Sequence, residues 1–176
     1  MKLIRDVKQL EKKLRRLQRR VSRKYLKNKE GSTFVKTSNI IKIEKQIKLL
    51  HRKLSNIRSN YNHQATNMIV KTKPSRVVME TLNIKGMMKN RHLSKAIAKQ
   101  GLHEFKRQMK YKCEFNGIEF VEAHKWYPSS KTCSKCGHIK SKLSLSERTY
   151  ICEECGCIID RDYNASINLS RYELVV

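Results

Sequence analysis

Apolar residues recur at three- and four-residue intervals through two long segments near the start of the chain. The first apolar seam runs from Leu3 to Val21 and the second from Ile40 to Tyr61, with lysine and arginine filling most positions between. This spacing predicts two amphipathic helices, each with one narrow apolar seam and a broad basic face. The connecting segment contains a glycine and candidate helix caps at Ser38 or Asn39. We therefore expect a loop that joins two antiparallel helices.

The period changes after Pro74. An apolar, β-branched run from Arg76 to Met79 ends at Glu80 and is typical of a buried strand. A second strand is expected from Ile118 to Ala123, after Asn116-Gly117. Between them, residues 92–115 have apolar positions at multiples of four, interrupted by Gly101. A strand–helix–strand order of this kind predicts an α/β fold.

The composition changes again from Pro128 to Asp160. This segment is rich in serine, cysteine and glycine and short of large apolar residues. Packing alone could not hold so small a module together, which favours a metal as its stabilising element. The tail, DYNASINLSRY, regains helical spacing from Asp162 onwards and returns the chain to the main domain.

The charge of the chain favours nucleic acid as a partner. Forty lysines and arginines stand against 15 aspartates and glutamates, for a formal net charge of +25. Residues 1–70 hold 20 of the basic residues and only four of the acidic ones, so the expected hairpin carries much of this charge. Such a surface repels itself, and a polyanion would relieve the repulsion. An anionic membrane is a weaker alternative, and a merely solvated coiled coil would mix its charges more evenly.

Four of the six cysteines form two Cys-x-x-Cys pairs. Cys133 and Cys136 make the first pair and Cys152 and Cys155 the second, with 15 residues between the pairs and a glycine after each. Four thiolates in this spacing predict a structural Zn²⁺ site in a zinc ribbon, since no coordination position is left open for catalysis. A chain with reduced, metal-binding cysteines and no apolar run of membrane-spanning length is expected inside the cell, cytoplasmic and nucleoid-associated.

Other sulfur and imidazole groups are weaker candidates. Cys157 could replace Cys155 in a slipped register, although the regular spacing favours Cys155. Cys113 falls on the apolar face of the predicted helix and is interpreted as a small core residue. His124 and His138 flank the ribbon, but four cysteines already complete a tetrahedral site.

Three acidic residues stand out. Glu80 ends the first buried strand, while Asp160 and Asp162 lie where the ribbon meets the tail helix. From position alone, a carboxylate at a helix start is usually a cap and one at a strand end is usually exposed. The sequence motifs around these three residues give further evidence of their roles.

Five ordered segments carry a family resemblance: VVMETLNIKGM, FKRQMKYKCEFNGIEF, WYPSSKTCSKCG, KLSLSERTYICEECG and DRDYNASINL. Together with the basic hairpin, they resemble the OrfB/TnpB class of transposon-encoded proteins, relatives of type V CRISPR effectors. The resemblance covers essentially the whole chain. It implies an RNase H-like (RuvC) fold interrupted by a zinc ribbon, and a guide RNA that directs the cutting of DNA.

The resemblance also assigns roles to the carboxylates. Glu80 resembles the second catalytic carboxylate of the family, and Asp162 the third, because the shared Asp-x-Asn-Ala motif begins at Asp162 and not at Asp160. Clustered carboxylates of this kind hold two Mg²⁺ ions roughly 4 Å apart for phosphodiester cleavage. The implied organisation is a basic helical hairpin over 1–70, a partial RuvC-like α/β core over 71–127, a zinc ribbon over 128–159 and a returning helix over 160–176.

One departure from the family bears on activity. The family's first catalytic aspartate lies in an early Gly-x-Asp-x-Gly strand, and this sequence contains no such motif. Asp6, its only aspartate before Asp160, sits in a charged amphipathic helix. We therefore expect an incomplete RNase H-like fold, the carboxy-terminal part of a nuclease, which is inactive alone and binds Mg²⁺ only when the site is completed. A complementary amino-terminal chain or a homodimer is the expected partner, besides DNA and guide RNA.

Two alternatives stay open. The chain could be a non-enzymatic binder of DNA or RNA that regulates an intact relative. It could also be an unrelated zinc-ribbon factor, which would explain the charge and the cysteines but not the carboxylate motifs. The name transposase, common for such proteins, describes genetic context, because no strand-transfer nucleophile is evident.

Overall fold

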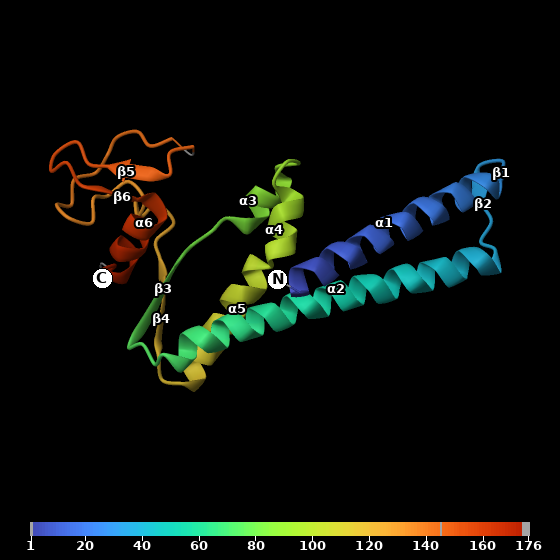
Figure 1. The fold of residues 1–176 in the computed structure, drawn as a ribbon, viewed down its shortest axis with the longest axis horizontal. Helices are drawn as coiled ribbons and strands as arrows, with labels where there is room; N and C mark the ends of the chain where they lie inside the picture. The colour runs from blue at the N-terminus through green and yellow to red at the C-terminus, as the bar shows by residue number, and fades with distance from the viewer. Residues whose placement is uncertain (1, 145, 174–176) are drawn as a thin grey trace. The chain divides into compact units, whose positions relative to one another are not determined.

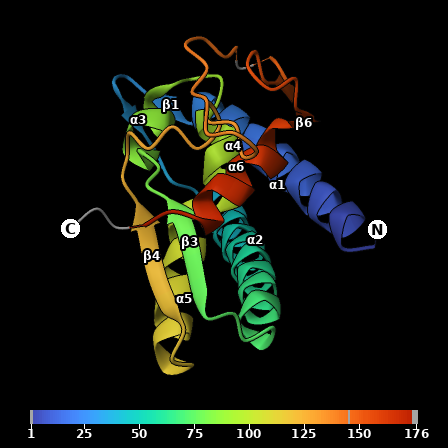
Figure 2. The same ribbon diagram turned by 90° about the vertical axis from the view of Figure 1, so that its left-hand side faces the viewer.

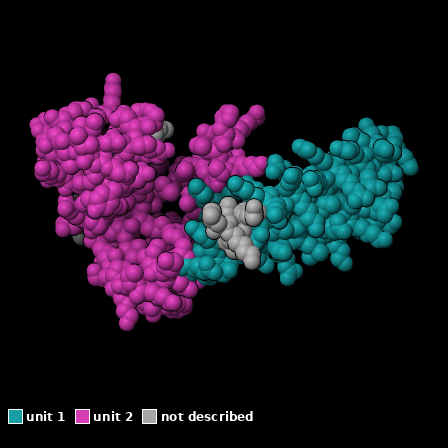
Figure 3. Space-filling model, in the orientation of Figure 1, with its two compact units in different colours: residues 1–64, 99–101 teal, residues 65–98, 102–176 magenta. Residues whose placement is uncertain are grey.

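A computed structural model describes residues 2–144 and 146–173. The chain forms two compact units, coloured separately in Figure 3. The first unit contains residues 1–64 and 99–101, and the second contains residues 65–98 and 102–176.

The first unit is the predicted helical hairpin. Helix α1 (Lys2–Lys27) and helix α2 (Ser38–Lys71) run antiparallel (Figure 1). Helix α2 continues ten residues beyond the predicted seam, into the second unit. Leu14, Leu50 and Leu54 are buried between the helices, with Val7 and Ile47 packed beside them. The two apolar seams therefore bury each other, as their spacing predicted, and the arginines and lysines of α1 remain largely exposed.

The connection between the helices holds more structure than expected. Two-residue strands, β1 (Lys29–Glu30) and β2 (Thr33–Phe34), pair antiparallel around a turn at Gly31. The predicted cap at Ser38 or Asn39 is wrong. The Thr37 hydroxyl accepts a hydrogen bond from the Ile40 backbone N–H at 3.4 Å, so Thr37 caps a helix that begins at Ser38. Three consecutive cap-forming residues, Thr-Ser-Asn, made the choice ambiguous from sequence.

The second unit contains the two predicted strands. Strand β3 (Arg76–Glu80) pairs in parallel with β4 (Glu119–Ala123), so that Val78 lies opposite Val121 and Glu80 opposite Ala123. Parallel pairing requires a long crossover, which the intervening helices supply. These are α3 (Ile84–Lys89), which the sequence did not predict, α4 (Ser94–Gln100) and α5 (Leu102–Phe115).

Gly101 separates α4 from α5, as its place in the helical pattern suggested. Its φ of +63° is a left-handed conformation that only glycine adopts without strain, so the helix must break there. Helix α5 then packs along one face of the strand pair (Figure 2). The core between them contains Met109, Cys113 and Ile118, with Val77 and Phe120 packed against it.

The face of the strand pair opposite α5 carries the Glu80 carboxylate. Because side chains alternate across a strand, Val78 and Glu80 project to the face away from Val77 and α5. Val121 and Ala123 of β4 share this face and are buried. Helix α6 (Arg161–Ser170) lies against β3.

The Cys-rich module precedes α6 in the chain. It contains one antiparallel strand pair, β5 (Thr149–Ile151) with β6 (Ile158–Asp160), and a small core around Tyr150. Helix α6 follows this module immediately, because it starts at the residue after β6. Among the helices of the described ranges, none combines the length and the apolarity needed to cross a bilayer.

Candidate metal centre and carboxylate site

Each Cys-x-x-Cys pair forms the same kind of tight backbone loop. In the first loop the Cys133 N–H donates to the His138 carbonyl at 2.8 Å, and the Gly137 N–H donates to the Cys133 carbonyl at 2.9 Å. The second loop repeats both bonds, from Cys152 to Cys157 and from Gly156 to Cys152. Gly137 and Gly156 have φ of +80° and +64°. The glycine after each pair is thus required by the turn, as predicted.

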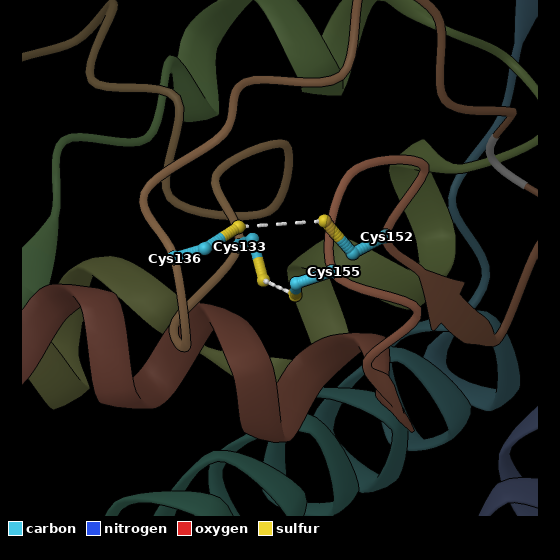
Figure 4. A group of neighbouring side chains, drawn as sticks. All are labelled: Cys133, Cys136, Cys152 and Cys155. Atoms are coloured by element: carbon cyan, nitrogen blue, oxygen red, sulfur yellow. Dashed lines mark hydrogen bonds between the residues drawn. The ribbon is translucent and has the colours of Figure 1, made fainter.

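The two loops bring four sulfur atoms together. All four Sγ atoms lie within 4.8 Å of one another (Figure 4). Cys133 and Cys155 Sγ are 3.7 Å apart, and Cys136 and Cys152 Sγ are 3.6 Å apart. A tetrahedral Zn²⁺ site with Zn–S bonds of about 2.3 Å has sulfurs separated by about 3.8 Å. The four cysteines therefore fit a tetrahedral metal of this size, and in each pair the first cysteine is buried and the second exposed.

The thiols influence one another's ionisation. Burial raises the pKa of Cys133, but hydrogen bonds from the backbone N–H groups of Cys136 and Lys135, together with those from the Cys152 and Cys136 side chains, outweigh it and lower the pKa to about 6. At Cys136 the His138 backbone N–H favours the thiolate, whereas burial and the neighbouring sulfurs raise the pKa to about 12. One thiolate thus suppresses the ionisation of another, and a divalent cation at their centre would remove this conflict.

The weaker metal-ligand candidates lie outside this group. Cys157 is half-buried in the small core of the Cys-rich module, and its sulfur is not among the four clustered atoms. Cys113 is fully buried in the core beside α5, as expected for a small apolar residue. His138 Nδ1 lies 3.8 Å from a Glu154 carboxylate oxygen, and His124 Nδ1 accepts a hydrogen bond from the Trp126 N–H.

Glu80 lines a small polar pocket. The Ser129 hydroxyl donates to Glu80 Oε1 at 2.7 Å, and the buried Ser129 fixes the carboxylate on one side. The pocket has a volume of about 190 Å³ and is also lined by His124, Lys125 and Tyr127. A carboxylate that stays accessible in such a pocket is able to hold a hard cation.

Asp162 lies in the first turn of α6, and the structure places it apart from that pocket. Its side chain is 74% exposed and pairs with Arg161 at 3.2 Å and Arg148 at 4.0 Å. Asp160 has the ordinary role of a helix cap, because its carboxylate accepts hydrogen bonds from the N–H groups of Asp162 and Tyr163. Asp162 is absent from the lining of the Glu80 pocket.

Two buried asparagines on α6, whose role the sequence did not reveal, fasten the first cysteine loop to the helix. Asn164 Nδ2 donates to the Thr132 carbonyl at 2.7 Å, and Asn164 Oδ1 accepts from the Ser134 N–H at 2.9 Å. Asn168 Nδ2 donates to the Thr132 and Ser129 carbonyls, both at 2.7 Å. Asn164 is the asparagine of the Asp-x-Asn-Ala motif, but neither that motif nor the spacing of polar residues four positions apart revealed these backbone contacts.

Comparisons with known proteins agree with this geometry. Residues 103–169, which include nearly all of α5, the cysteine cluster and most of α6, match the Cas12f1-like TNB domain family. A protein of Streptomyces pristinaespiralis named as an RNA-guided DNA endonuclease is 33% identical over 157 residues, covering 89% of this chain and 36% of the relative. TnpB-like protein L79 of Acanthamoeba polyphaga mimivirus is 27% identical, covering 76% and 26%.

A solved structure extends the agreement to the fold. The Cas12f1 chain in a complex with sgRNA and target DNA matches with a TM-score of 0.58 and 26% identity, covering 76% of this chain and 39% of that one. Fold and cysteine cluster together define an α/β protein of the Cas12f type with a four-cysteine TNB domain.

The chain is thus a relative of the TnpB family of RNA-guided DNA endonucleases, and the resemblance inferred from its motifs is confirmed. It spans about a third of the length of the Streptomyces relative and about a quarter of the length of the mimivirus relative. This kinship argues against an unrelated ribosomal or transcriptional zinc ribbon.

Proposed function

We propose that the chain is the nucleic-acid-binding, carboxy-terminal part of an RNA-guided DNA endonuclease. The observation that carries the proposal is the joining, in one compact unit, of a four-cysteine module to a helix that begins beside Asp162 and a strand that ends at Glu80. The match of residues 103–169 to the Cas12f1-like TNB domain family supports the same conclusion.

In this proposal the cysteine cluster holds a structural Zn²⁺. The sulfur separations of 3.6 and 3.7 Å support a tetrahedral ion, and four thiolates leave no position for water or substrate. Zinc bound there would stabilise the fold of residues 128–159 and take no part in the cleavage step.

Glu80 and Asp162 are the proposed second and third carboxylates of a RuvC-like site. When Mg²⁺ is bound, it would polarise the scissile phosphate and lower the pKa of an attacking water. Glu80 would hold the cation from the polar pocket, while Asp162 would leave its arginine partners to complete the ligand set. Residues 1–176 contain aspartates only at positions 6, 160 and 162, so the first carboxylate of the proposed site would come from outside these residues, for example from a complementary amino-terminal chain or a second copy.

The hairpin and an exposed tryptophan supply the proposed contacts to DNA and guide RNA. Arg15, Arg16, Arg19 and Arg20 of α1 are exposed, and arginines on one helix suit phosphate backbones. Trp126 is 76% exposed, with Lys125 Nζ 4.7 Å from its ring centroid. Trp126 directly follows Lys125, which lines the Glu80 pocket. An exposed indole ring of this kind can stack on an unpaired base.

A second candidate is a non-enzymatic binder that regulates an intact relative. The observation in its favour is the exposed Asp162, which is paired with Arg148 and Arg161 and absent from the Glu80 pocket. A carboxylate in this state binds no shared cation with Glu80. Both candidates need the hairpin and the cysteine cluster, and they differ only in whether cleavage can be completed in trans.

The deciding experiment measures Mg²⁺-dependent cleavage of single- and double-stranded DNA by the zinc-loaded chain. It is run with and without co-purifying RNA, and with and without an amino-terminal fragment of a relative that carries the Gly-x-Asp-x-Gly motif. We expect binding without cleavage by the chain alone, and cleavage once the fragment is added. Glu80→Ala and Asp162→Ala should abolish that cleavage and leave DNA binding intact.

Other outcomes separate the candidates. Cleavage by the chain alone that both substitutions abolish would mean that an unrecognised carboxylate completes the site. Binding with no cleavage under any condition, including the added fragment, would favour the regulator.

A further inference from the structure

A single loop, residues 129–134, contacts all three parts of the proposed site. It contains Cys133, the first ligand of the cysteine cluster. Its first residue, Ser129, donates to the Glu80 carboxylate of β3. Its carbonyl and N–H groups, at Ser129, Thr132 and Ser134, are bound by side chains of α6. The loop therefore lies between the metal cluster and the two elements that carry Glu80 and Asp162.

The contacts to α6 are buried and specific. Asn164 is fully buried, and Asn168 is 5% exposed. Asn164 binds one carbonyl and one N–H of the loop, and Asn168 bridges two carbonyls. A displacement of the loop would leave these amides buried without partners, which is strongly unfavourable. Outside this buried pair, the exposed Arg171 adds a bond from Nη1 to the Ser134 carbonyl at 2.6 Å.

The contact to β3 is equally direct. Ser129 is 5% exposed, and its two polar groups face different partners. Its hydroxyl donates to Glu80 and its carbonyl accepts from Asn168. One residue thus connects the strand that ends at Glu80 with the helix that begins beside Asp162.

The order of this loop depends on the cysteine cluster. Few large apolar residues hold the Cys-rich module, and its small core is built largely around two of the cysteines themselves. Without a metal, few buried apolar contacts hold the two cysteine loops together. Metal binding would order the loop, and the loop would order whatever is bound to it.

We propose that Ser129, Asn164 and Asn168 are positioning residues that couple metal occupancy of the cysteine cluster to the placement of Glu80 and of α6 with Asp162. The inference rests on the proposed function in naming these two carboxylates, but the coupling itself is a property of the fold. The cysteine cluster then has a second role beyond holding its own module together: it sets the geometry of the carboxylates.

Hydrogen exchange followed by mass spectrometry tests the coupling in the full chain. The chain is compared in zinc-loaded form and after removal of zinc by a chelator. We expect chelation to speed exchange of amides in α6 and around Glu80 by about tenfold or more, in addition to amides of the cysteine loops. In Asn164→Ala/Asn168→Ala, chelation should still affect the cysteine loops, but α6 should exchange at one rate with or without zinc.

Controls separate coupling from general instability. Ser166→Ala, on the exposed side of α6, should retain the wild-type response, because its hydroxyl binds only the Tyr163 carbonyl within the helix. Cobalt replacing zinc should give the visible spectrum of a tetrahedral cobalt thiolate in every variant, which verifies that the cluster is intact. If the double variant does not fold, the exposed Arg171→Gln carries the test, with a smaller loss of the response.

Substitutions of Ser129 test the coupling between zinc occupancy and the Glu80 segment. Ser129→Ala should remove the zinc dependence of exchange around Glu80, whereas Ser129→Thr, which keeps the hydroxyl, should restore it. The proposal is overturned if α6 and the Glu80 segment exchange equally fast with and without zinc in the wild type. It is also overturned if the response persists in the substituted chains. None of these readouts requires cleavage, so a failure of the proposed nuclease function would leave the coupling measurable, and a failure of the coupling would leave DNA binding and cleavage to be tested.

Discussion

At the scale of single residues, the buried and exposed cysteines differ in what surrounds them. Cys133 and Cys152 are almost inaccessible, at 1% and 2% exposure, while Cys136 and Cys155 face solvent. The first residue of each pair therefore contributes to the small core as well as to the ligand set, and its loss removes both.

We expect Cys152→Ser to abolish stoichiometric zinc binding and to unfold residues 128–159. The loss of a ligand should exceed the 10–100-fold drop in affinity that is typical when an outer-shell partner is removed. Zinc content of the purified chain and the cobalt–thiolate spectrum are the measurements. Cys157→Ser is the matched control and should keep full zinc content; a zinc-free Cys157→Ser would show that Cys157 is a ligand after all.

The clustering of the four cysteines could be predicted from the sequence, whereas the backbone contacts that hold their loops could not. A pair of Cys-x-x-Cys motifs encodes its geometry locally, because each loop closes on itself around its own glycine. Asn168 instead binds backbone carbonyls 36 and 39 positions away. A backbone carbonyl belongs to every residue, so no side-chain pattern marks it as a partner. Ser129 and Glu80, 49 positions apart, were hidden for the same reason.

At the scale of secondary-structure elements, the apolar runs predicted β3 and β4 because α5 packs against β4 and α6 against β3, although β3 is half-buried and not buried as expected. The paired strands β1 and β2 have two exposed residues each and carry no apolar pattern. Helix α3 has six residues, none of them buried, and begins with an Asn83 cap. Elements stabilised by turns and caps instead of burial leave little trace in the distribution of apolar residues.

Gly101 gives a prediction at the break between α4 and α5. Gly101→Ala should lower the free energy of unfolding by about 1–2 kcal/mol, since φ there is +63°. The added Cβ would also lie 3.2 Å from Asn62 Nδ2. Urea denaturation measures the effect. Gly117→Ala, at φ +66° with open space around it, isolates the backbone strain and should cost less. Equal losses would mean that the Asn62 contact is unimportant.

The turn end of the hairpin should respond to acid through Glu44. Hydrogen bonds from Tyr25 and then Lys36 lower the pKa of Glu44 below its usual 4.5. A lowered acidic pKa stabilises the fold above the ordinary value and ceases to do so as the pH falls through the lowered one. Glu44→Gln should therefore reduce the thermal stability of the chain at pH 7 and have little effect below that pKa. A difference that grows on acidification would contradict this assignment.

At the scale of the whole molecule, net charge determines how tightly the chain binds a polyanion and how strongly salt weakens that binding. With a net charge of +25, binding should fall steeply as salt rises. The dependence reports the number of phosphates that are neutralised, and not the sequence that is bound.

Removing three exposed arginines from α1 should reduce that dependence. For Arg16→Gln/Arg20→Gln/Arg23→Gln, the slope of log K against log salt on duplex DNA should become shallower by about 2–3, at roughly 0.9 per phosphate contact. Fluorescence anisotropy at several salt concentrations measures it. The matched control, Lys71→Gln/Lys73→Gln/Lys85→Gln, removes the same charge from exposed positions outside α1. Equal slopes for the two triple variants would show that only net charge matters.

The parallel pairing of β3 with β4 also bears on how the chain is made. Strand β3 leaves the ribosome well before β4, and α3, α4 and α5 must be synthesised before the two strands can meet. Contacts that close so long a loop form late and slowly, while β5 and β6 are near neighbours in the chain. During that delay the apolar run Val77–Met79 has no strand beside it. Nascent chains halted at this stage would therefore be prone to associate through β3.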